Sequence, residues 1–150
     1  MDLNRLRRTL RWFYILEVNQ VALYKVQARL TAEEVDKRLY FKAAEIESGH
    51  VRNILGALTH FGGRPGLLAL LAPLTGAIAG ALTSLFNNKI TLRVDIALEN
   101  RAMTDYLNFI RTCPHQSLRE ILWSNCLDES LHNEWFKARL RGDIDKLSAP

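Results

Sequence analysis

One arrangement of acidic residues and histidines occurs twice in this sequence, and it constrains the fold more than any other feature. In each copy a glutamate precedes an E-x-x-H motif by 30 residues, and the second copy follows the first by 82 residues. The six residues are Glu17, Glu47, His50, Glu99, Glu129 and His132. Tyr24 and Tyr106 repeat at the same offset, seven residues after the first glutamate of each copy. The repeat predicts two equivalent halves related by a pseudo-two-fold axis.

The spacing within each motif indicates that its acidic and imidazole groups act together on a helix. Residues three apart share a helix face, so each E-x-x-H directs a carboxylate and an imidazole to one side. Apolar residues flank the upstream glutamates, with Leu16 and Val18 around Glu17 and Leu98 before Glu99. Four inward carboxylates are costly to desolvate unless cations or protons neutralise them. Two divalent metal ions would balance their charge.

The donor types indicate which metals fit. Carboxylate oxygens and two imidazoles, without a thiolate, suit iron or manganese better than structural zinc. We expect two iron ions, with manganese as the alternative. The motif glutamates would bridge the metals, the upstream glutamates would bind terminally, and each imidazole would complete one coordination shell. Tyr24 and Tyr106 would lie next to the ligands, or would serve only as packed core aromatics.

Hydrophobic periodicity predicts four long helices and hence an all-α four-helix bundle. The predicted helices cover residues 3–30, 32–60, 90–113 and 118–141. Thr31 with Glu34, and Ser117 with Glu120, have the spacing of capping boxes at the starts of the second and fourth helices. Gly142 is the expected C-terminal stop of the fourth.

The connection between the second and third helices is long and apolar. Between Arg64 and Lys89 there are 24 consecutive uncharged residues, which is long enough for a membrane span. Pro73 and Gly76 favour a shorter, broken helix, and a span would place the two helical hairpins on opposite sides of a bilayer. Residues 65–87 are therefore expected to form broken helices that cross the bundle and meet a membrane surface, a partner chain or only the bundle itself.

Composition indicates one cytoplasmic domain over residues 1–150. The chain is 48% hydrophobic and carries a formal charge of +4, which does not require nucleic acid as a partner. The basic residues near the N-terminus form a cluster that suits an anionic membrane surface, a nucleic acid or, as is more common, a solvated helix end. We expect no nucleic acid partner. Cys113 and Cys126 lack the spacing of a redox or zinc motif, so a reducing compartment fits.

The ligand pattern resembles that of the ferritin-like di-iron carboxylate superfamily, and the chain is most similar to the demethoxyubiquinone hydroxylase family of ubiquinone biosynthesis. The resemblance extends from residue 3 to His132. Besides the six ligands it includes Tyr24 and Gln27, the apolar run from Leu71 to Leu85, Ala97-Leu98 before Glu99, and Tyr106, Asn108 and Ile110-Arg111.

The resemblance implies an enzyme, a di-iron oxidoreductase and monooxygenase that uses dioxygen to hydroxylate a quinone-like small molecule. Reducing equivalents would come from a nicotinamide, and the apolar crossover would lie peripherally on the membrane that holds the substrate. We also expect a homo-oligomer. The alternatives are a ferritin-like iron-oxidising or peroxide-reducing protein, and a non-enzymatic metal-binding bundle.

Overall fold

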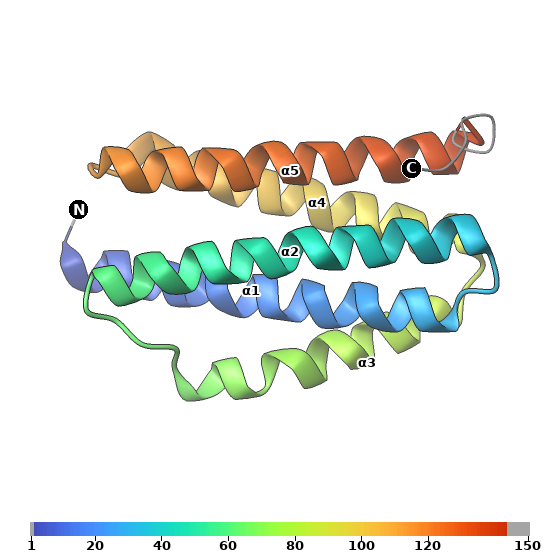
Figure 1. Ribbon diagram of the computed structural model, residues 1–150, viewed down its shortest axis with the longest axis horizontal. Coiled ribbons are helices and arrows are strands. Elements are labelled where there is room, and N and C mark those ends of the chain that lie inside the picture. The colour runs from blue at the N-terminus through green and yellow to red at the C-terminus, as the bar shows by residue number, and fades with distance from the viewer. Residues whose placement is uncertain (1, 144–150) are drawn as a thin grey trace. The chain divides into compact units, whose positions relative to one another are not determined.

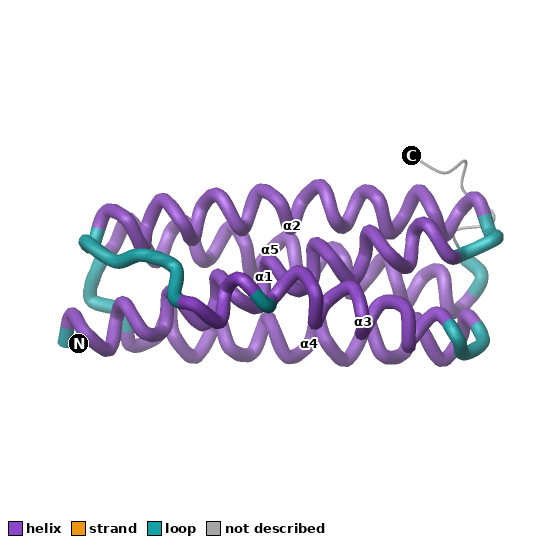
Figure 2. The backbone as a smooth tube through the Cα atoms, turned by 90° about the horizontal axis from the view of Figure 1, so that it is seen from below, coloured by secondary structure: helices purple, strands orange, loops and turns teal. Residues whose placement is uncertain are grey.

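The computed structural model describes residues 2–143, and this part of the chain is helical throughout apart from turns and loops (Figures 1 and 2). It contains five α-helices and one 3₁₀-helix: α1 Leu3–Leu30, α2 Glu34–His60, η1 Leu67–Leu70, α3 Ala72–Ser84, α4 Asn88–Thr112 and α5 Gln116–Arg141. The expected all-α class is confirmed. The fifth α-helix is α3, which forms within the long connection.

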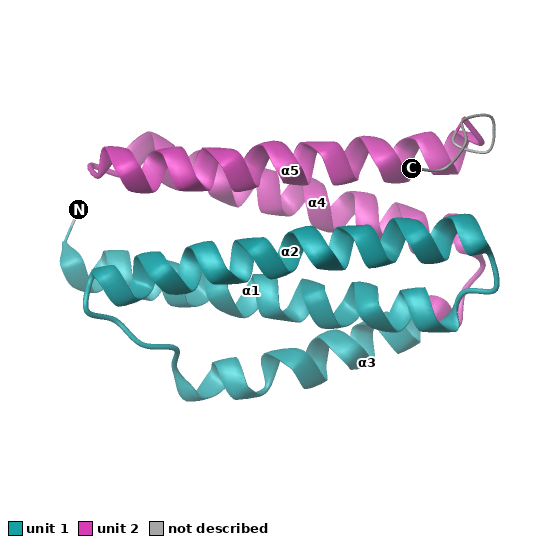
Figure 3. Cartoon of the chain, in the orientation of Figure 1, with its two compact units in different colours: residues 1–82 teal, residues 83–150 magenta. Residues whose placement is uncertain are grey.

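The chain divides into two compact units, residues 1–82 and residues 83–150 (Figure 3). The first contains the α1–α2 hairpin with η1 and most of α3, and the second contains the α4–α5 hairpin. Each hairpin turn is short, as expected for antiparallel neighbours in a bundle. The ferritin-like arrangement of the two hairpins and the single domain over residues 1–150 stay predictions.

The α1–α2 hairpin is held by a buried stripe with helical spacing. On α1 the stripe begins with Leu6, Leu10 and Phe13, and it continues with polar residues, among them Glu17. Tyr24 of α1 stacks on Tyr40 of α2, with ring centroids 6.2 Å apart and planes inclined by 12°. Parallel aromatic contact of this kind adds roughly 0.5–1.5 kcal/mol to the gain from burial. Apolar and aromatic contacts before and after Glu17 along α1 therefore hold the two helices of the hairpin together.

Both predicted capping boxes are wrong, although the helices they were meant to start are present. Thr31 closes α1, its hydroxyl accepts a hydrogen bond from the Glu33 amide, and α2 begins at Glu34 without a side-chain cap. Helix α5 begins at Gln116, so Ser117 already lies within its first turn. Helix α2 begins two residues later than predicted because the Thr31 hydroxyl completes a turn in the loop and does not cap the next helix. Helix α5 begins two residues earlier than predicted.

Gly142 closes α5 as expected, because it adopts the left-handed backbone conformation with φ of 79°. Such a conformation costs a glycine little and disfavours residues with a Cβ. At the start of the α4–α5 hairpin, the Asn87 side chain caps α4 by accepting a hydrogen bond from the Ile90 amide. Asn133 of α5 donates to the backbone oxygen of Ile96 in α4 and ties that hairpin together.

Helix α3 packs against α1 through its smallest residues. Ala72, Gly76 and Gly80 are its buried positions, four residues apart. A Cβ on Gly76 would overlap the Asn19 carbonyl of α1, and one on Gly80 would lie 2.6 Å from the Leu23 carbonyl. The Asn19 amide also donates to the Thr75 hydroxyl at 2.8 Å. Residues 65–87 thus contain the broken helices that the sequence predicts, and α3 runs along α1 in the same direction.

No helix within residues 2–143 has both the length and the apolar character that crossing a bilayer requires. Helix α3 has 13 residues, fewer than the roughly 20 that span a bilayer core.

The close approach of α3 to α1 leads to a test of packing. Gly76→Ala should lower the free energy of unfolding by about 1–3 kcal/mol, because the added methyl group meets backbone and forces the helices apart. The matched control is Gly56→Ala in α2, where a Cβ meets nothing within 4 Å and alanine should stabilise the helix by about 0.5–1 kcal/mol. Urea denaturation of both variants measures the difference. Equal stability of the two would contradict the packing described.

Candidate metal centre

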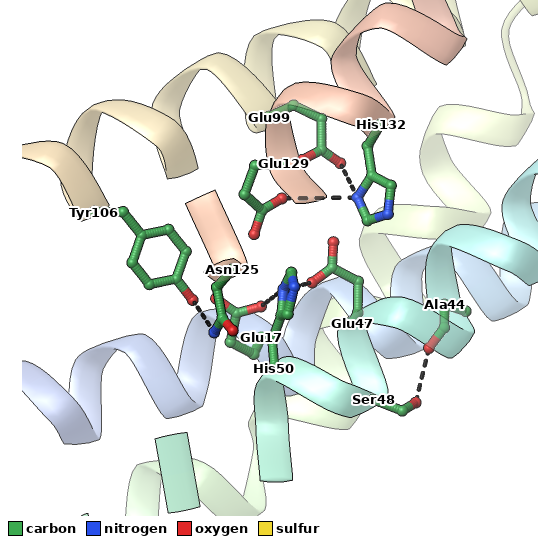
Figure 4. Close-up of polar contacts among 10 residues, drawn as sticks. All are labelled: Glu17, Ala44, Glu47, Ser48, His50, Glu99, Tyr106, Asn125, Glu129 and His132. Carbon is green, nitrogen blue, oxygen red and sulfur yellow. Dashed lines mark hydrogen bonds and ion pairs between the residues drawn. The ribbon is translucent and has the colours of Figure 1, made fainter. Parts of the chain in front are cut away.

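The first unit contains a buried triad of potential metal ligands. Glu17 lies on α1, and Glu47 and His50 lie one turn apart on α2. The His50 Nδ1 atom is 2.9 Å from Glu47 Oε2 and 3.4 Å from Glu17 Oε2 (Figure 4). One ligand atom from each of the three lies within 4.8 Å of the others. The antiparallel hairpin therefore brings residues 30 positions apart to one point.

The second unit repeats this triad with looser spacing. Glu99 lies on α4, and Glu129 and His132 lie on α5. The His132 Nδ1 atom is 3.7 Å from Glu99 Oε1 and 3.8 Å from Glu129 Oε2 (Figure 4). Here too the ligand atoms can lie within 4.8 Å of one another. Each unit by itself thus offers two carboxylates and one imidazole.

Each triad places two carboxylates in a buried position, and their negative charge is unfavourable there. All six side chains are at most 2% exposed. A protonated histidine neutralises only one of the two carboxylates in its triad, and removing a net charge from water costs several kcal/mol. A divalent cation between the carboxylates would neutralise both and would use the imidazole nitrogen as a further ligand. The burial and the donor types therefore fit metal binding.

The cysteines do not join either triad. Cys126 precedes Glu129 by three residues on α5, but its thiol contacts the Met103 carbonyl of α4. Burial raises the pKa of the Cys126 thiol, and the charge of Glu129 raises it further. A thiol with a raised pKa stays protonated and is a poor ligand. The donors are therefore oxygen and imidazole nitrogen, the set that suits iron or manganese.

The two repeated tyrosines are both buried but have different partners. Tyr106 accepts a hydrogen bond from the Asn125 amide at 3.3 Å (Figure 4), whereas Tyr24 stacks on Tyr40. Asn125 is a residue that the sequence interpretation missed, although its place one turn before Glu129 on α5 could have indicated it. A catalytic role for Tyr24 and Tyr106 stays a prediction.

Two aspartates and the two remaining histidines take varied positions. Asp95 is fully buried one turn before Glu99 on α4, and Asp128 is partly buried. His60 is the exposed last residue of α2, with its ring edge-on to Phe61, and His115 precedes α5. Neither histidine belongs to a triad.

Comparison with known proteins finds no family, no characterised protein and no solved structure that matches the chain significantly. The structure brings the six candidate ligand residues together as two triads, one in each unit. Metal binding by these residues, and a single dinuclear site formed by both triads, stay predictions.

Metal binding by the triads should stabilise the protein. Ferrous iron at a thousandfold excess over its Kd should add about 4 kcal/mol to the free energy of unfolding, because only the folded chain assembles the ligands. Thermal unfolding under anaerobic conditions, with and without iron, measures the effect as a rise in Tm.

The matched controls are glutamate variants on the same helix. Glu47→Gln should lose most of this rise, whereas Glu45→Gln should keep it, since Glu45 is exposed and pairs with Lys42 at 2.9 Å. A rise in Tm that Glu47→Gln retains in full would contradict metal binding at the first triad.

Proposed function

We propose that the two hairpins associate through their buried triads, hold two iron ions and form a dioxygen-activating oxidoreductase. The observation that carries the proposal is the occurrence of the same buried set, two carboxylates and one imidazole, on both hairpins. Either triad alone leaves a metal with few protein ligands. Joined, four carboxylates would balance two ferrous ions, and the glutamates of the two E-x-x-H motifs would be placed to bridge them.

The small number of ligands is what favours a reactive site over a structural one. Six residues shared between two metals leave coordination positions for small molecules, whereas a structural site is closed by protein ligands. Two ferrous ions, when bound, would supply the electrons for the reduction of dioxygen. The four glutamates of the chain would balance the charge of the two metal ions, and the i, i+3 spacing on each helix would orient the imidazoles. The apolar residues around the triads would keep water out of the site.

The substrate is proposed from the resemblance alone. A monooxygenase similar to demethoxyubiquinone hydroxylase would act on a quinone ring, with reducing equivalents from a nicotinamide. The described helices offer a buried, helix-lined site of the kind that such chemistry needs. Iron oxidation or peroxide reduction would use the same ligands, so the products of the reaction have to distinguish these activities.

We expect two iron ions per chain after anaerobic loading, and consumption of dioxygen when the loaded protein meets air. Glu47→Ala and Glu129→Ala should each lose the metal pair, because each removes a proposed bridge, whereas Glu45→Ala should bind iron like the parent protein. Metal analysis of desalted samples and an oxygen electrode make the measurements. One iron or none per chain in the parent protein would refute the dinuclear site.

The imidazoles of His50 and His132 should contribute unequally to the affinity for iron. His50 lies closer to its carboxylates than His132 does, at 2.9 and 3.4 Å against 3.7 and 3.8 Å. The first triad is therefore the more preorganised, and His50→Ala should weaken the tighter of two binding steps while His132→Ala weakens the other. Anaerobic iron titrations of both variants, measured by isothermal titration calorimetry, test this prediction. Identical losses in both steps would show that the two triads are equivalent.

The enzyme proposal is tested separately with a quinone. A quinone bearing an unsubstituted ring position should be hydroxylated by the reduced, iron-loaded protein, with one oxygen atom from ¹⁸O₂ found in the product by mass spectrometry. Dioxygen consumption that yields only hydrogen peroxide, water or ferric iron would favour the iron-oxidising alternative. Loading of two irons without any reaction would favour the non-enzymatic one.

A further inference from the structure

A line of buried polar side chains leads along α1 from the first triad towards the turn of its hairpin. Gln20, Tyr24 and Gln27 follow Glu17 at successive turns of the helix, and each of them is at most 7% exposed. At 1.5 Å of rise per residue, Gln27 lies about 15 Å from Glu17 along the helix. Polar groups inside a hairpin are costly to desolvate, so a line of this length needs a reason.

Helix α2 continues this line on the side that faces α1. Tyr40 precedes Glu47 by seven residues and stacks on Tyr24, with ring centroids 6.2 Å apart. Asp36 lies one turn nearer the start of α2 and is fully buried. The antiparallel register therefore places Asp36 at about the level of Gln27. We call these five residues the polar line: Gln20, Tyr24, Gln27, Asp36 and Tyr40.

The outer end of the polar line lies at the turn between α1 and α2. Thr31 at the end of α1 is partly exposed, and Glu33 before α2 is exposed. Asp36 follows Glu33 by three residues. A carboxylate at the surface accepts and releases protons in contact with water. The polar line thus spans the distance between an acidic, exposed turn and the buried carboxylates of the first triad.

The second unit provides an internal comparison, because it repeats the hairpin framework at an offset of 82 residues. The counterparts of the three outer residues of the polar line are apolar and buried. They are Leu122 for Tyr40, Phe109 for Gln27 and Leu118 for Asp36. Beyond the second triad, Tyr106 and Asn125 are the last buried polar side chains before the turn between α4 and α5 (Figure 4). Since the same framework packs with apolar residues at these positions, packing alone does not account for the polar line.

The chemical groups of the polar line suit the transfer of protons. A tyrosine hydroxyl both donates and accepts hydrogen bonds, so it can receive a proton on one side and release one on the other. The Asp36 carboxylate can hold a proton. The amides of Gln20 and Gln27 also donate and accept, and such groups hold bridging water in place. A route for metal ions would need several carboxylates, and the polar line has one.

We propose that the polar line is the path by which protons reach the first triad from the turn between α1 and α2. A proton taken up at the turn passes to Asp36 and then along the hydroxyls of Tyr40 and Tyr24. It arrives at the carboxylate of Glu17 and the imidazole of His50, where Oε2 and Nδ1 lie 3.4 Å apart. Each donor regains a proton from the solvent side, so the polar line is unchanged after each transfer.

The proposal rests on the proposed function for the reaction that consumes these protons. Hydroxylation of a small molecule by dioxygen takes up two electrons and two protons and releases one water. The electrons come from the nicotinamide, and the protons come from solvent. Reduction of hydrogen peroxide to two waters also takes up two electrons and two protons. A buried site that excludes bulk water therefore needs a defined proton supply for either activity.

Proton exchange at His50 tests the path without any metal. In metal-free protein labelled with ¹⁵N-histidine, NMR measures how fast each imidazole N–H exchanges with water, and His50→Gln assigns the signal. Tyr40→Phe keeps the ring that stacks on Tyr24 and removes only the hydroxyl. It should slow exchange at His50 at least about tenfold, because the transfer is interrupted. Exchange at His132, measured in the same sample, should be unchanged.

Tyr14→Phe is the matched control, since it makes the same change at a partly buried tyrosine of α1 outside the polar line. Exchange at His50 in this variant should equal that of the parent protein. Gln27→Leu interrupts the polar line at its next level and should also slow exchange, which keeps the test available if Tyr40→Phe does not fold. A loosened hairpin would open more often and raise the exchange rate, so a merely structural effect has the opposite sign.

Dioxygen consumption by the iron-loaded protein separates the path from the proposed function. Tyr40→Phe should bind two irons and consume dioxygen more slowly, whereas Tyr14→Phe should match the parent protein. If the parent consumes no dioxygen, the proposed function fails, and slower exchange at His50 in Tyr40→Phe still establishes the path. Unchanged or faster exchange at His50 in both Tyr40→Phe and Gln27→Leu would overturn the path, even in a protein that consumes dioxygen.

Discussion

The desolvation of carboxylates is the constraint on which the rest of this structure depends. Glu17 and Glu47 in one hairpin, and Glu99 and Glu129 in the other, are removed from water almost completely. Burial of such groups is unfavourable unless opposite charge is close. Long helices meet the geometric part of this requirement, because i, i+3 spacing and antiparallel pairing fix three donors without using a flexible loop. The packing of apolar side chains in each hairpin offsets part of the free-energy cost of burying the carboxylates.

The two hairpins share a ligand set but not its surroundings. In the first, Tyr24 stacks on Tyr40 and His50 lies within 3.4 Å of both carboxylates. In the second, Tyr106 is held by Asn125, and His132 is farther from its carboxylates. A duplicated framework with different neighbours creates two sites of unequal preorganisation.

Helix α3 shows how backbone contact decides the orientation of an otherwise uniformly apolar segment. Its hydropathy alone does not distinguish one side from another, since both the inward and the outward residues are uncharged. Gly76 and Gly80 permit an approach to the α1 backbone that any larger residue would prevent. Once these positions face inward, helical geometry places Leu74 and Ile78 outward. Close packing on one side therefore produces an apolar surface on the other.

The all-α class, the long helices and the clustering of the six candidate ligand residues could be predicted from the sequence, because periodicity and i, i+3 spacing are local properties that survive in any compact fold. Metal binding by these six residues stays a prediction. The predicted starts of α2 and α5 are each wrong by two residues, because Thr31 and Ser117 have several local hydrogen-bonding options of similar energy. Only the tertiary structure decided that Asn125 holds Tyr106, that α3 faces α1 with its glycines, and that the leucines of η1 lie exposed. These features depend on contacts between residues far apart in the chain, and hydropathy or spacing within one segment contains no information about them.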